Sequence, residues 1–78
     1  MEKISGLDFK IKEMALRIRE LREVVGYTTA EMAQRTGVSE AQYQEYEQGS
    51  VDLPFTFLHK CALAFGVELT ELLEGRDP

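Results

Sequence analysis

Residues 26–49 read GYTTAEMAQRTGVSEAQYQEYEQG, and two helix-capping signals divide this stretch into two short helices. Thr28 is followed three residues later by Glu31, a T-x-x-E pattern in which each side chain can bond to the backbone N–H of the other residue. Ser39 and Gln42 repeat the pattern as S-x-x-Q. The stretch therefore predicts one helix that begins after Thr28 and a second that begins at Ser39.

The segment between these two helices is very short. The first helix is predicted over about residues 29–36 and the second over residues 39–48, which leaves only Gly37 and Val38 between them. Two residues allow only a sharp angle between consecutive helices, and glycine readily ends a helix and turns the chain. These residues predict a helix-turn-helix with its turn at Gly37.

The second of these helices has two different faces. At helical spacing, Tyr43 and Tyr46 fall on one side with Val38 and Glu47, and we expect the tyrosines to fill the core. The opposite side is small and polar and carries Ala41, Gln44, Glu45 and Gln48.

The rest of the chain has the apolar period of helices rather than that of strands. Ahead of the central stretch, one apolar stripe consists of Met14, Ile18, Leu21 and Val25. After it, a helix with Pro54 in its first turn has a stripe made of Leu53, Phe55, Leu58, Cys61, Ala62 and Phe65. A last short helix over residues 69–74 would place on the core Leu69, Leu72 and Leu73. The expected fold class is all-α, a compact domain of five helices without a strand.

Length and composition favour one small domain without catalytic chemistry. The chain has 78 residues, of which 44% are apolar and 29% charged, as in ordinary globular proteins. Cys61 is the single cysteine and His59 the single histidine, so no disulfide, metal cluster or activated nucleophile is expected. We expect no cofactor and no enzymatic activity. The sequence has no signal-peptide pattern and no apolar run of about 18 residues, which predicts a cytoplasmic protein without a membrane span.

Charge is distributed unevenly along the chain. The net charge is −5, and residues 1–35 hold seven Lys and Arg against six Asp and Glu. Residues 36–78 hold two against eight. The acidic half is unfavourable for nucleic-acid binding, because phosphate neutralisation by Lys and Arg supplies most non-specific affinity.

Four segments carry a resemblance to a known family. The pattern I-R-x-L-R lies at residues 18–22, A-x-x-x-G-V-S at 33–39, an aromatic residue followed by E-x-G at 46–49, and A-L-G-V-x-x-x-x-L-L at 64–73, with Phe65 in place of leucine. In this order they resemble the Cro and phage-repressor type of helix-turn-helix domain, the XRE family. The resemblance covers about residues 14–75 and implies a lambda-repressor-like fold, with an N-terminal extension at residues 1–13 and a tail at residues 76–78.

The resemblance also implies a DNA interface and a function as the sequence-specific DNA-binding domain of a transcriptional regulator. The second helix of the motif would lie in the major groove of duplex DNA, while the first crosses the backbone. Ser39, at the start of this helix, would belong to the DNA interface, and the residues that would face bases are Glu40, Ala41, Gln44 and Glu45. Phosphate contacts would come from Thr29, Gln48 and Ser50, with the nearest cations at Arg17, Arg19 and Arg35. Arg22 and Glu47 match positions that usually pair, and we expect the domain to bind as a symmetric homodimer.

The missing cations leave an alternative open. No Lys or Arg lies between Thr36 and His59, and a carboxylate that can accept a bond from cytosine also repels phosphate. Glu40 and Glu45 could be solvated residues of an exposed face, and the basic residues of the first helix could form surface pairs such as Arg19–Glu23. The alternative function is an acidic helix-turn-helix scaffold that acts as a protein-interaction module for a basic partner.

The end of the sequence resembles a linker. Residues 74–78 are polar and contain Gly75 and Pro78 directly after the last predicted core leucines. Acidic domains of this kind often precede a small-molecule-sensing cupin barrel, so the resemblance implies an effector domain in a longer native chain.

Overall fold

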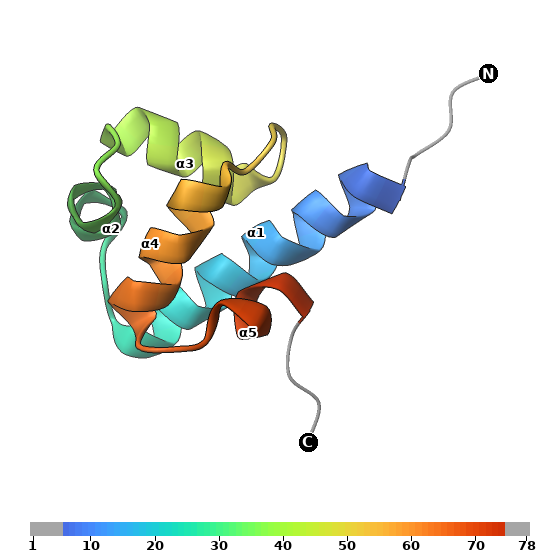
Figure 1. The fold of residues 1–78 in the computed structure, drawn as a ribbon. Coiled ribbons are helices and arrows are strands. Elements are labelled where there is room, and N and C mark those ends of the chain that lie inside the picture. Colours follow the sequence, from blue (N-terminus) through green and yellow to red (C-terminus); the bar gives the residue numbers. More distant parts are fainter. Residues whose placement is uncertain (1–5, 75–78) are drawn as a thin grey trace.

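The computed structural model describes residues 6–74, which form five α-helices and no strand (Figure 1). The helices are α1 (Gly6–Val25), α2 (Thr29–Thr36), α3 (Glu40–Gln48), α4 (Phe55–Phe65) and α5 (Leu69–Glu74). The all-helical fold class predicted from the sequence is confirmed. No helix in this part of the chain has the length and hydrophobicity needed to cross a membrane.

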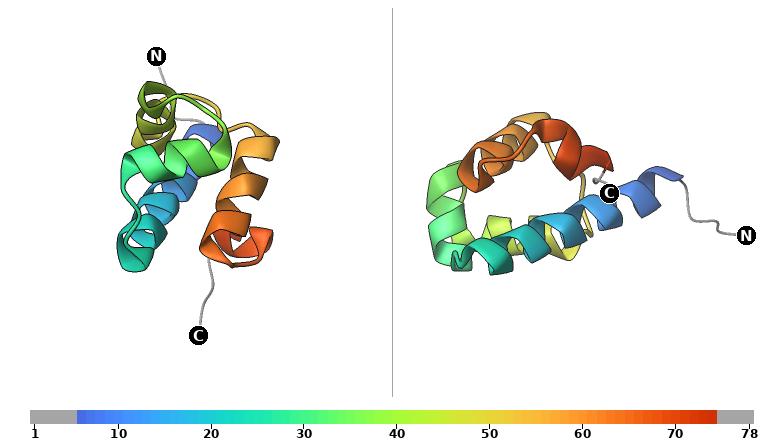
Figure 2. Two further views of the ribbon diagram at one scale, coloured as in Figure 1. Left: turned by 90° about the vertical axis from the view of Figure 1, so that its left-hand side faces the viewer. Right: turned by 90° about the horizontal axis from the view of Figure 1, so that it is seen from below.

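Helix α1 is the long element on which α3, α4 and α5 pack, while α2 packs against α3 and α4 (Figures 1 and 2). It begins upstream of the predicted stripe, so that Ile11 joins Met14 and Ile18 in the buried core. Val25 was expected to belong to this stripe, and that prediction is wrong because its side chain is 44% exposed. Val25 is the last residue of α1, and the chain turns away immediately after it at Gly26.

The helix-turn-helix forms where the capping signals predict it. The Thr28 hydroxyl accepts a bond from the Glu31 N–H at 3.0 Å, and the Thr28 N–H donates to the Glu31 carboxylate at 2.8 Å, which completes the capping box. At the other end of α2, Gly37 adopts a left-handed φ of 76°, and the Val38 N–H donates to the Ala33 carbonyl at 3.1 Å. This is the Schellman arrangement, which glycine allows without steric cost.

The second capping signal forms only in part. The Ser39 hydroxyl accepts from the Gln42 N–H at 3.0 Å, so Ser39 is the N-cap and α3 begins at Glu40. The side chain of Gln42 does not return this bond but donates to the Glu45 carboxylate at 3.1 Å. The S-x-x-Q pattern therefore marks the helix start correctly, whereas the reciprocal bond expected from Gln42 is absent from the hydrogen bonds of α3.

Helix α4 buries Leu58, Cys61 and Ala62 as predicted but departs from the predicted stripe at its start. Pro54 is the N-cap rather than a residue of the first turn, and Phe55 is 63% exposed. Phe57 is buried in its place, because it lies one turn before Cys61 on the same side of the helix. The Phe57 ring contacts the Tyr46 ring with centroids 4.4 Å apart. The predicted core position of Phe55 is therefore wrong.

The core receives side chains from every helix. Tyr43, predicted to face inward, is fully buried, and Tyr46 packs against the core. Helix α5 contributes the fully buried Leu72, as the sequence predicts, and it lies against α1 and α4. The buried apolar residues are Ile11, Met14, Ala15, Ile18, Met32, Ala33, Tyr43, Phe57, Leu58, Cys61, Ala62 and Leu72.

Candidate nucleic-acid interface

Five side chains of α3 are exposed and form its outer face. They come from the first turn and from the side turned away from Tyr43, and they are Glu40, Ala41, Gln44, Glu45 and Gln48. All five were predicted as interface residues, and the structure brings them together on one helix. Because none of them is a cation, this face offers carboxylate and amide groups only.

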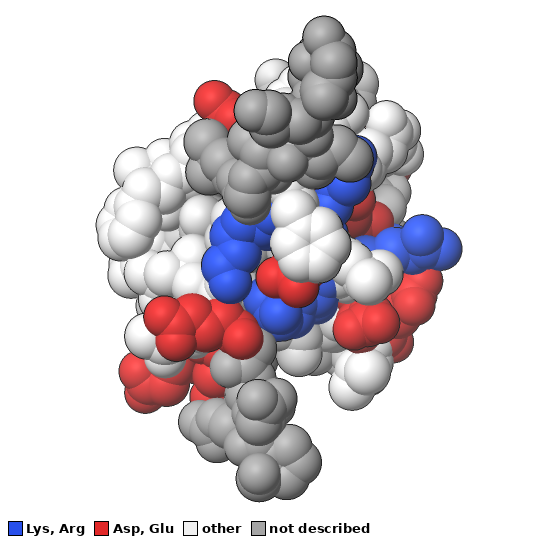
Figure 3. Space-filling model, turned by 90° about the vertical axis from the view of Figure 1, so that its right-hand side faces the viewer, with Lys and Arg blue, Asp and Glu red and all other residues white. Residues whose placement is uncertain are grey.

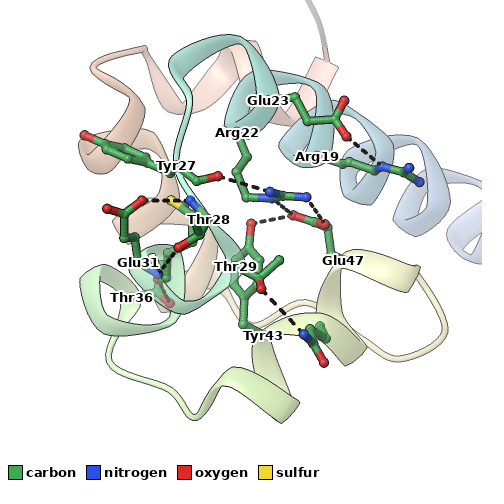
Figure 4. A network of polar contacts seen from close by, with 12 residues as sticks. Arg19, Arg22, Glu23, Tyr27, Thr28, Thr29, Glu31, Thr36, Tyr43 and Glu47 are labelled. Atoms are coloured by element: carbon green, nitrogen blue, oxygen red, sulfur yellow. Dashed lines mark hydrogen bonds and ion pairs between the residues drawn. The ribbon is translucent and has the colours of Figure 1, made fainter.

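A cluster of hydrogen bonds links the start of α2 to the start of α3. The Thr29 hydroxyl donates to the Glu40 carboxylate at 2.7 Å, and the Gln44 amide lies 3.5 Å from both oxygens of this pair. Figure 4 shows Thr29 beside Thr28 and Glu31, which form the capping box of α2. We call Thr29, Glu40 and Gln44 the exposed cluster. It joins residues predicted to contact phosphates and bases into one polar patch.

The inner side of α3 is fixed by an ion pair to α1, as the resemblance implies. Arg22 Nε and Nη2 donate to the two Glu47 carboxylate oxygens at 2.8 and 3.1 Å, a bidentate geometry (Figure 4). The Tyr43 hydroxyl donates to the same carboxylate at 2.6 Å, and Arg22 Nη1 donates to the Tyr27 carbonyl at 3.1 Å. The Arg22 and Glu47 side chains are only 15% and 10% exposed. We call Arg22, Tyr43 and Glu47 the buried triad.

The buried triad changes the acidity of its members. The hydrogen bond to Glu47 raises the pKa of Arg22, so this guanidinium keeps its charge. Burial, and then the hydrogen bond to Glu47, raise the pKa of Tyr43 far above its ordinary value of 10.0. Both effects favour the state in which Arg22 is charged and Tyr43 is neutral, so the pairing that anchors α3 persists across the neutral range.

An open groove lies between α1 and the outer side of α3. Its volume is about 510 Å³, and it is lined on α1 by Lys12, Leu16 and Arg19 and on α3 by Gln44, Glu47 and Gln48. Lys12 Nζ donates to the Gly49 carbonyl at 3.3 Å. Gly49 has a left-handed φ of 74°, and a Cβ there would lie 3.2 Å from Lys12 Cα and from Ala15 Cβ. The missing side chain at Gly49 therefore lets the end of α3 approach α1. We call this the α1–α3 groove.

Of the predicted cations, only Arg19 lies in the α1–α3 groove. Arg19 also forms the predicted surface pair with Glu23 at 3.3 Å. Arg17 lies on another side of α1, where Nη1 donates to the Leu72 carbonyl of α5 at 2.7 Å. Arg35, near the end of α2, places its guanidinium 4.3 Å from the Tyr27 ring centroid. The predicted basic residues are therefore distributed over three parts of the surface.

Lys12 is a cation beside α3 that the sequence analysis did not include. It falls within the residues treated as an N-terminal extension, yet α1 is continuous through this region. Its spacing of seven residues from Arg19 is the signal that could have identified it, because residues seven apart share a helix face. Ser50, predicted as a phosphate contact, is exposed and shares with Lys12 a second hollow lined also by Asp8 and Asp52.

Positive and negative side chains are mixed on the face that includes the start of α1. Figure 3 shows Lys and Arg near the centre of this face, with Asp and Glu gathered at the lower left and at the right. Although the second half of the sequence is acidic, this face of the molecule has positively charged regions.

The single cysteine and histidine have ordinary surroundings. Cys61 is fully buried, and burial, followed by the negative charge of Glu47, raises the pKa of its thiol to about 12. His59 is exposed, and its ring is parallel to that of Phe55 with centroids 6.4 Å apart. Within residues 6–74, no group of three or more His, Cys, Asp or Glu side chains is placed to hold a metal ion.

Comparison with known proteins agrees with the geometry. A model of the helix-turn-helix domain family matches residues 13–74. Over 33 residues, or 42% of this chain, the sequence is 54% identical to a protein of Pyrococcus furiosus named as an HTH-type transcriptional regulatory protein. The match spans 10% of that relative, so this chain corresponds to a small part of it.

Two crystal structures of the clp gene regulator ClgR from Corynebacterium glutamicum share the fold. One aligns over 80% of this chain and 66% of its own with a TM-score of 0.76 and 24% identity. The other aligns over 90% and 87%, with a TM-score of 0.76 and 23% identity. At this level of identity the likeness concerns the fold. Since the family model covers most of the chain, the protein belongs to the helix-turn-helix domain family.

Proposed function

We propose that this domain binds duplex DNA within a transcriptional regulator, with the first half of α3 in the major groove. One observation carries the proposal: the inner side of α3 is fixed to α1 by the buried triad, while its outer side remains polar and exposed. A helix held in this way can offer a fixed set of side chains to base edges at little entropic cost.

The exposed residues of α3 suit bases that present amino groups. Carboxylates only accept hydrogen bonds, and in the major groove cytosine N4 is a donor without an acceptor on the same base edge. Glu40 and Glu45 would accept from cytosine, Gln44 would pair with adenine, and Ala41 would leave room for a base or contact a thymine methyl group. Ser39, the N-cap of α3, would lie beside the DNA at the edge of the major groove.

Phosphate contacts would come from polar groups around α3. Gln48 on the outer face, and Thr29 and Ser50 beside it, are exposed or half-exposed and carry amide or hydroxyl groups. For Thr29 to donate to a phosphate, its hydroxyl would have to leave Glu40. Arg19 and Arg35 would add charge on either side. Arg17 donates to the Leu72 carbonyl, and we assign it to holding α5 rather than to DNA.

The proposal includes the assembly and the place of action. The domain would act by binding rather than by catalysis, in the cytoplasm and as a symmetric homodimer that reads two half-sites. Its relative from Pyrococcus furiosus is about ten times longer than the matched segment, which supports a longer native chain. The effector domain, such as a cupin barrel, is proposed from the family resemblance alone.

A second candidate function follows from the charge. Helix α3 has no basic residue and exposes Glu40 and Glu45, which favours binding of a basic protein surface over binding of phosphate. In this alternative the domain is a protein-interaction module, and substitutions that remove negative charge from α3 weaken binding to the partner.

Titration of random and genomic duplexes at low salt, followed by fluorescence anisotropy, tests the proposal. Glu45→Lys is expected to tighten binding because it removes a charge that faces phosphate. Glu68→Lys, which makes the same charge change at an exposed residue ahead of α5, is the matched control. No binding by the unmodified domain at high micromolar concentration, or equal effects of the two substitutions, would contradict the proposed role of α3.

A further inference from the structure

The α1–α3 groove holds positive charge in the region where the proposed interface has none. Lys12 and Arg19 line it from α1, opposite Gln44 and Gln48 of the outer face of α3. The rise of an α-helix places their Cα atoms about 10 Å apart along α1. Two long basic side chains at this spacing on one helix face can reach neighbouring phosphates of one DNA strand.

Lys12 and Arg19 both keep unused donor capacity. An ammonium has three N–H donors, and the Gly49 carbonyl accepts from one of them. Arg19 bonds to Glu23 through Nε alone, at 3.3 Å, and both side chains of this pair are more than half exposed. An exposed pair contributes little to stability, so its arginine can turn toward a phosphate at small cost.

The other walls of the groove also suit a nucleic-acid backbone. Leu16 lies between the two cations on α1 and is 53% exposed, so it could give an apolar surface to a deoxyribose. Gln44 and Gln48 add amide donors from the opposite wall. Glu47 also reaches the groove, but its carboxylate is already bound by Arg22 and Tyr43.

We propose that the α1–α3 groove binds consecutive phosphates of one DNA strand through Lys12 and Arg19 and so replaces the cations that α3 lacks. This assignment rests on the proposed function and makes α1 part of the interface. It also explains the glycine at position 49, because the close approach of α3 to Lys12 and Ala15 builds the groove. Asp52, which lines the hollow on the other side of Lys12, would weaken phosphate binding there.

The salt dependence of DNA binding tests this assignment. The logarithm of the DNA-binding constant K falls linearly with the logarithm of the salt concentration. Each phosphate contact that is lost lowers the magnitude of this slope by about 0.9. Lys12→Gln is expected to lower it by about 0.9 and the double variant Lys12→Gln/Arg19→Gln by about 1.8. Lys12→Arg is expected to keep the slope, and Asp52→Asn to tighten binding.

Lys10→Gln is the matched control, because Lys10 lies on α1, forms a surface pair with Glu13 at 3.7 Å and does not line the groove. The slope of this variant should equal that of the unmodified domain. If Lys10→Gln and Lys12→Gln lower the slope equally, only net charge matters and the groove assignment fails while the proposed function stands. If the unmodified domain does not bind duplex at low salt, both fail together.

Discussion

Glu40 and Glu47 lie seven residues apart on α3, yet their carboxylates have different surroundings. Glu47 is held by a bidentate bond from Arg22 and by the Tyr43 hydroxyl, and its side chain is 10% exposed. Glu40 also accepts a hydroxyl bond, from Thr29 at 2.7 Å, but it remains exposed. The two residues share a helix and differ in what covers them: α1 covers Glu47 and leaves Glu40 open. A glutamate that a neighbouring helix covers can therefore stabilise the fold, whereas a glutamate that stays exposed is available to a ligand.

The largest expected effect comes from removing the buried carboxylate. Glu47→Ala leaves the Arg22 guanidinium without its partner in a mostly buried site, which should cost about 3 kcal/mol of unfolding free energy. Urea denaturation measures the loss. Glu45→Ala is the control on the exposed side of α3 and should change stability by less than about 0.5 kcal/mol. Equal stability of Glu47→Ala and the unmodified domain would show that the buried triad does not anchor α3.

Substitutions of the glycines at the ends of α2 and α3 test the close approach of α3 to α1, which covers Glu47. Gly37 and Gly49 have nearly the same left-handed φ, so an alanine at either position costs about 1 kcal/mol for the backbone alone. At Gly49 the new Cβ would also meet Lys12 Cα and Ala15 Cβ at 3.2 Å, whereas at Gly37 it would meet only Lys60 Nζ at 3.6 Å. Gly49→Ala should therefore lose about 2 kcal/mol, clearly more than Gly37→Ala. Melting curves of the two variants decide the point, and equal losses would argue against the close approach.

Tyr43→Phe sharpens the comparison by removing one bond to Glu47. Loss of a hydrogen bond to a charged group should cost about 1.5 kcal/mol at neutral pH. The raised pKa of Tyr43 means that the folded state retains its proton more strongly than the unfolded state does. This stabilisation is complete below pH 10.0, the ordinary value, and is lost as pH rises above it. The stability difference between the two proteins should therefore shrink above that pH, and a constant difference would contradict it.

The smallest expected effect is at the exposed cluster. Glu40→Gln keeps an acceptor for the Thr29 hydroxyl and removes a solvated charge, so the free energy of unfolding should change by less than about 0.5 kcal/mol. The DNA preference should change instead, because an amide can also donate to bases that a carboxylate cannot approach. Parallel denaturation and binding measurements separate the two effects. A loss of stability as large as that of Glu47→Ala would remove the distinction between the two glutamates.

The sequence predicts the helix-turn-helix well because local chemistry determines it. The Thr28 capping box and the left-handed Gly37 need only neighbouring residues, and both form as predicted. The pairing of Arg22 with Glu47 was predicted from the family pattern, because nothing in the local sequence links two residues that lie 25 positions apart. Phe55 was placed in the core because apolar character alone does not reveal which of two nearby phenylalanines the rest of the fold covers.

The candidate interface is less predictable from sequence than the fold. Helical spacing is sufficient to predict the outer face of α3. Whether a basic residue can contribute to the interface depends instead on which helix lies beside it. Arg17 and Arg19 are two residues apart, yet one contacts α5 and the other lines the groove beside α3. Lys12 becomes relevant only because Gly49, 37 residues later, brings the end of α3 to it. The surroundings of these basic residues are therefore set by tertiary packing, which local sequence patterns do not reveal.

The bond from Arg17 to the Leu72 carbonyl has a consequence for the order of folding. It joins residues 55 positions apart, and α5, with six residues, is too short to be stable as an isolated helix. Closing so long a loop costs chain entropy that only the assembled α1 and α4 surface can offset. Helix α5 is therefore expected to dock after the other helices and to open before them, so that the amide hydrogens of α5 exchange with solvent before those of the other helices.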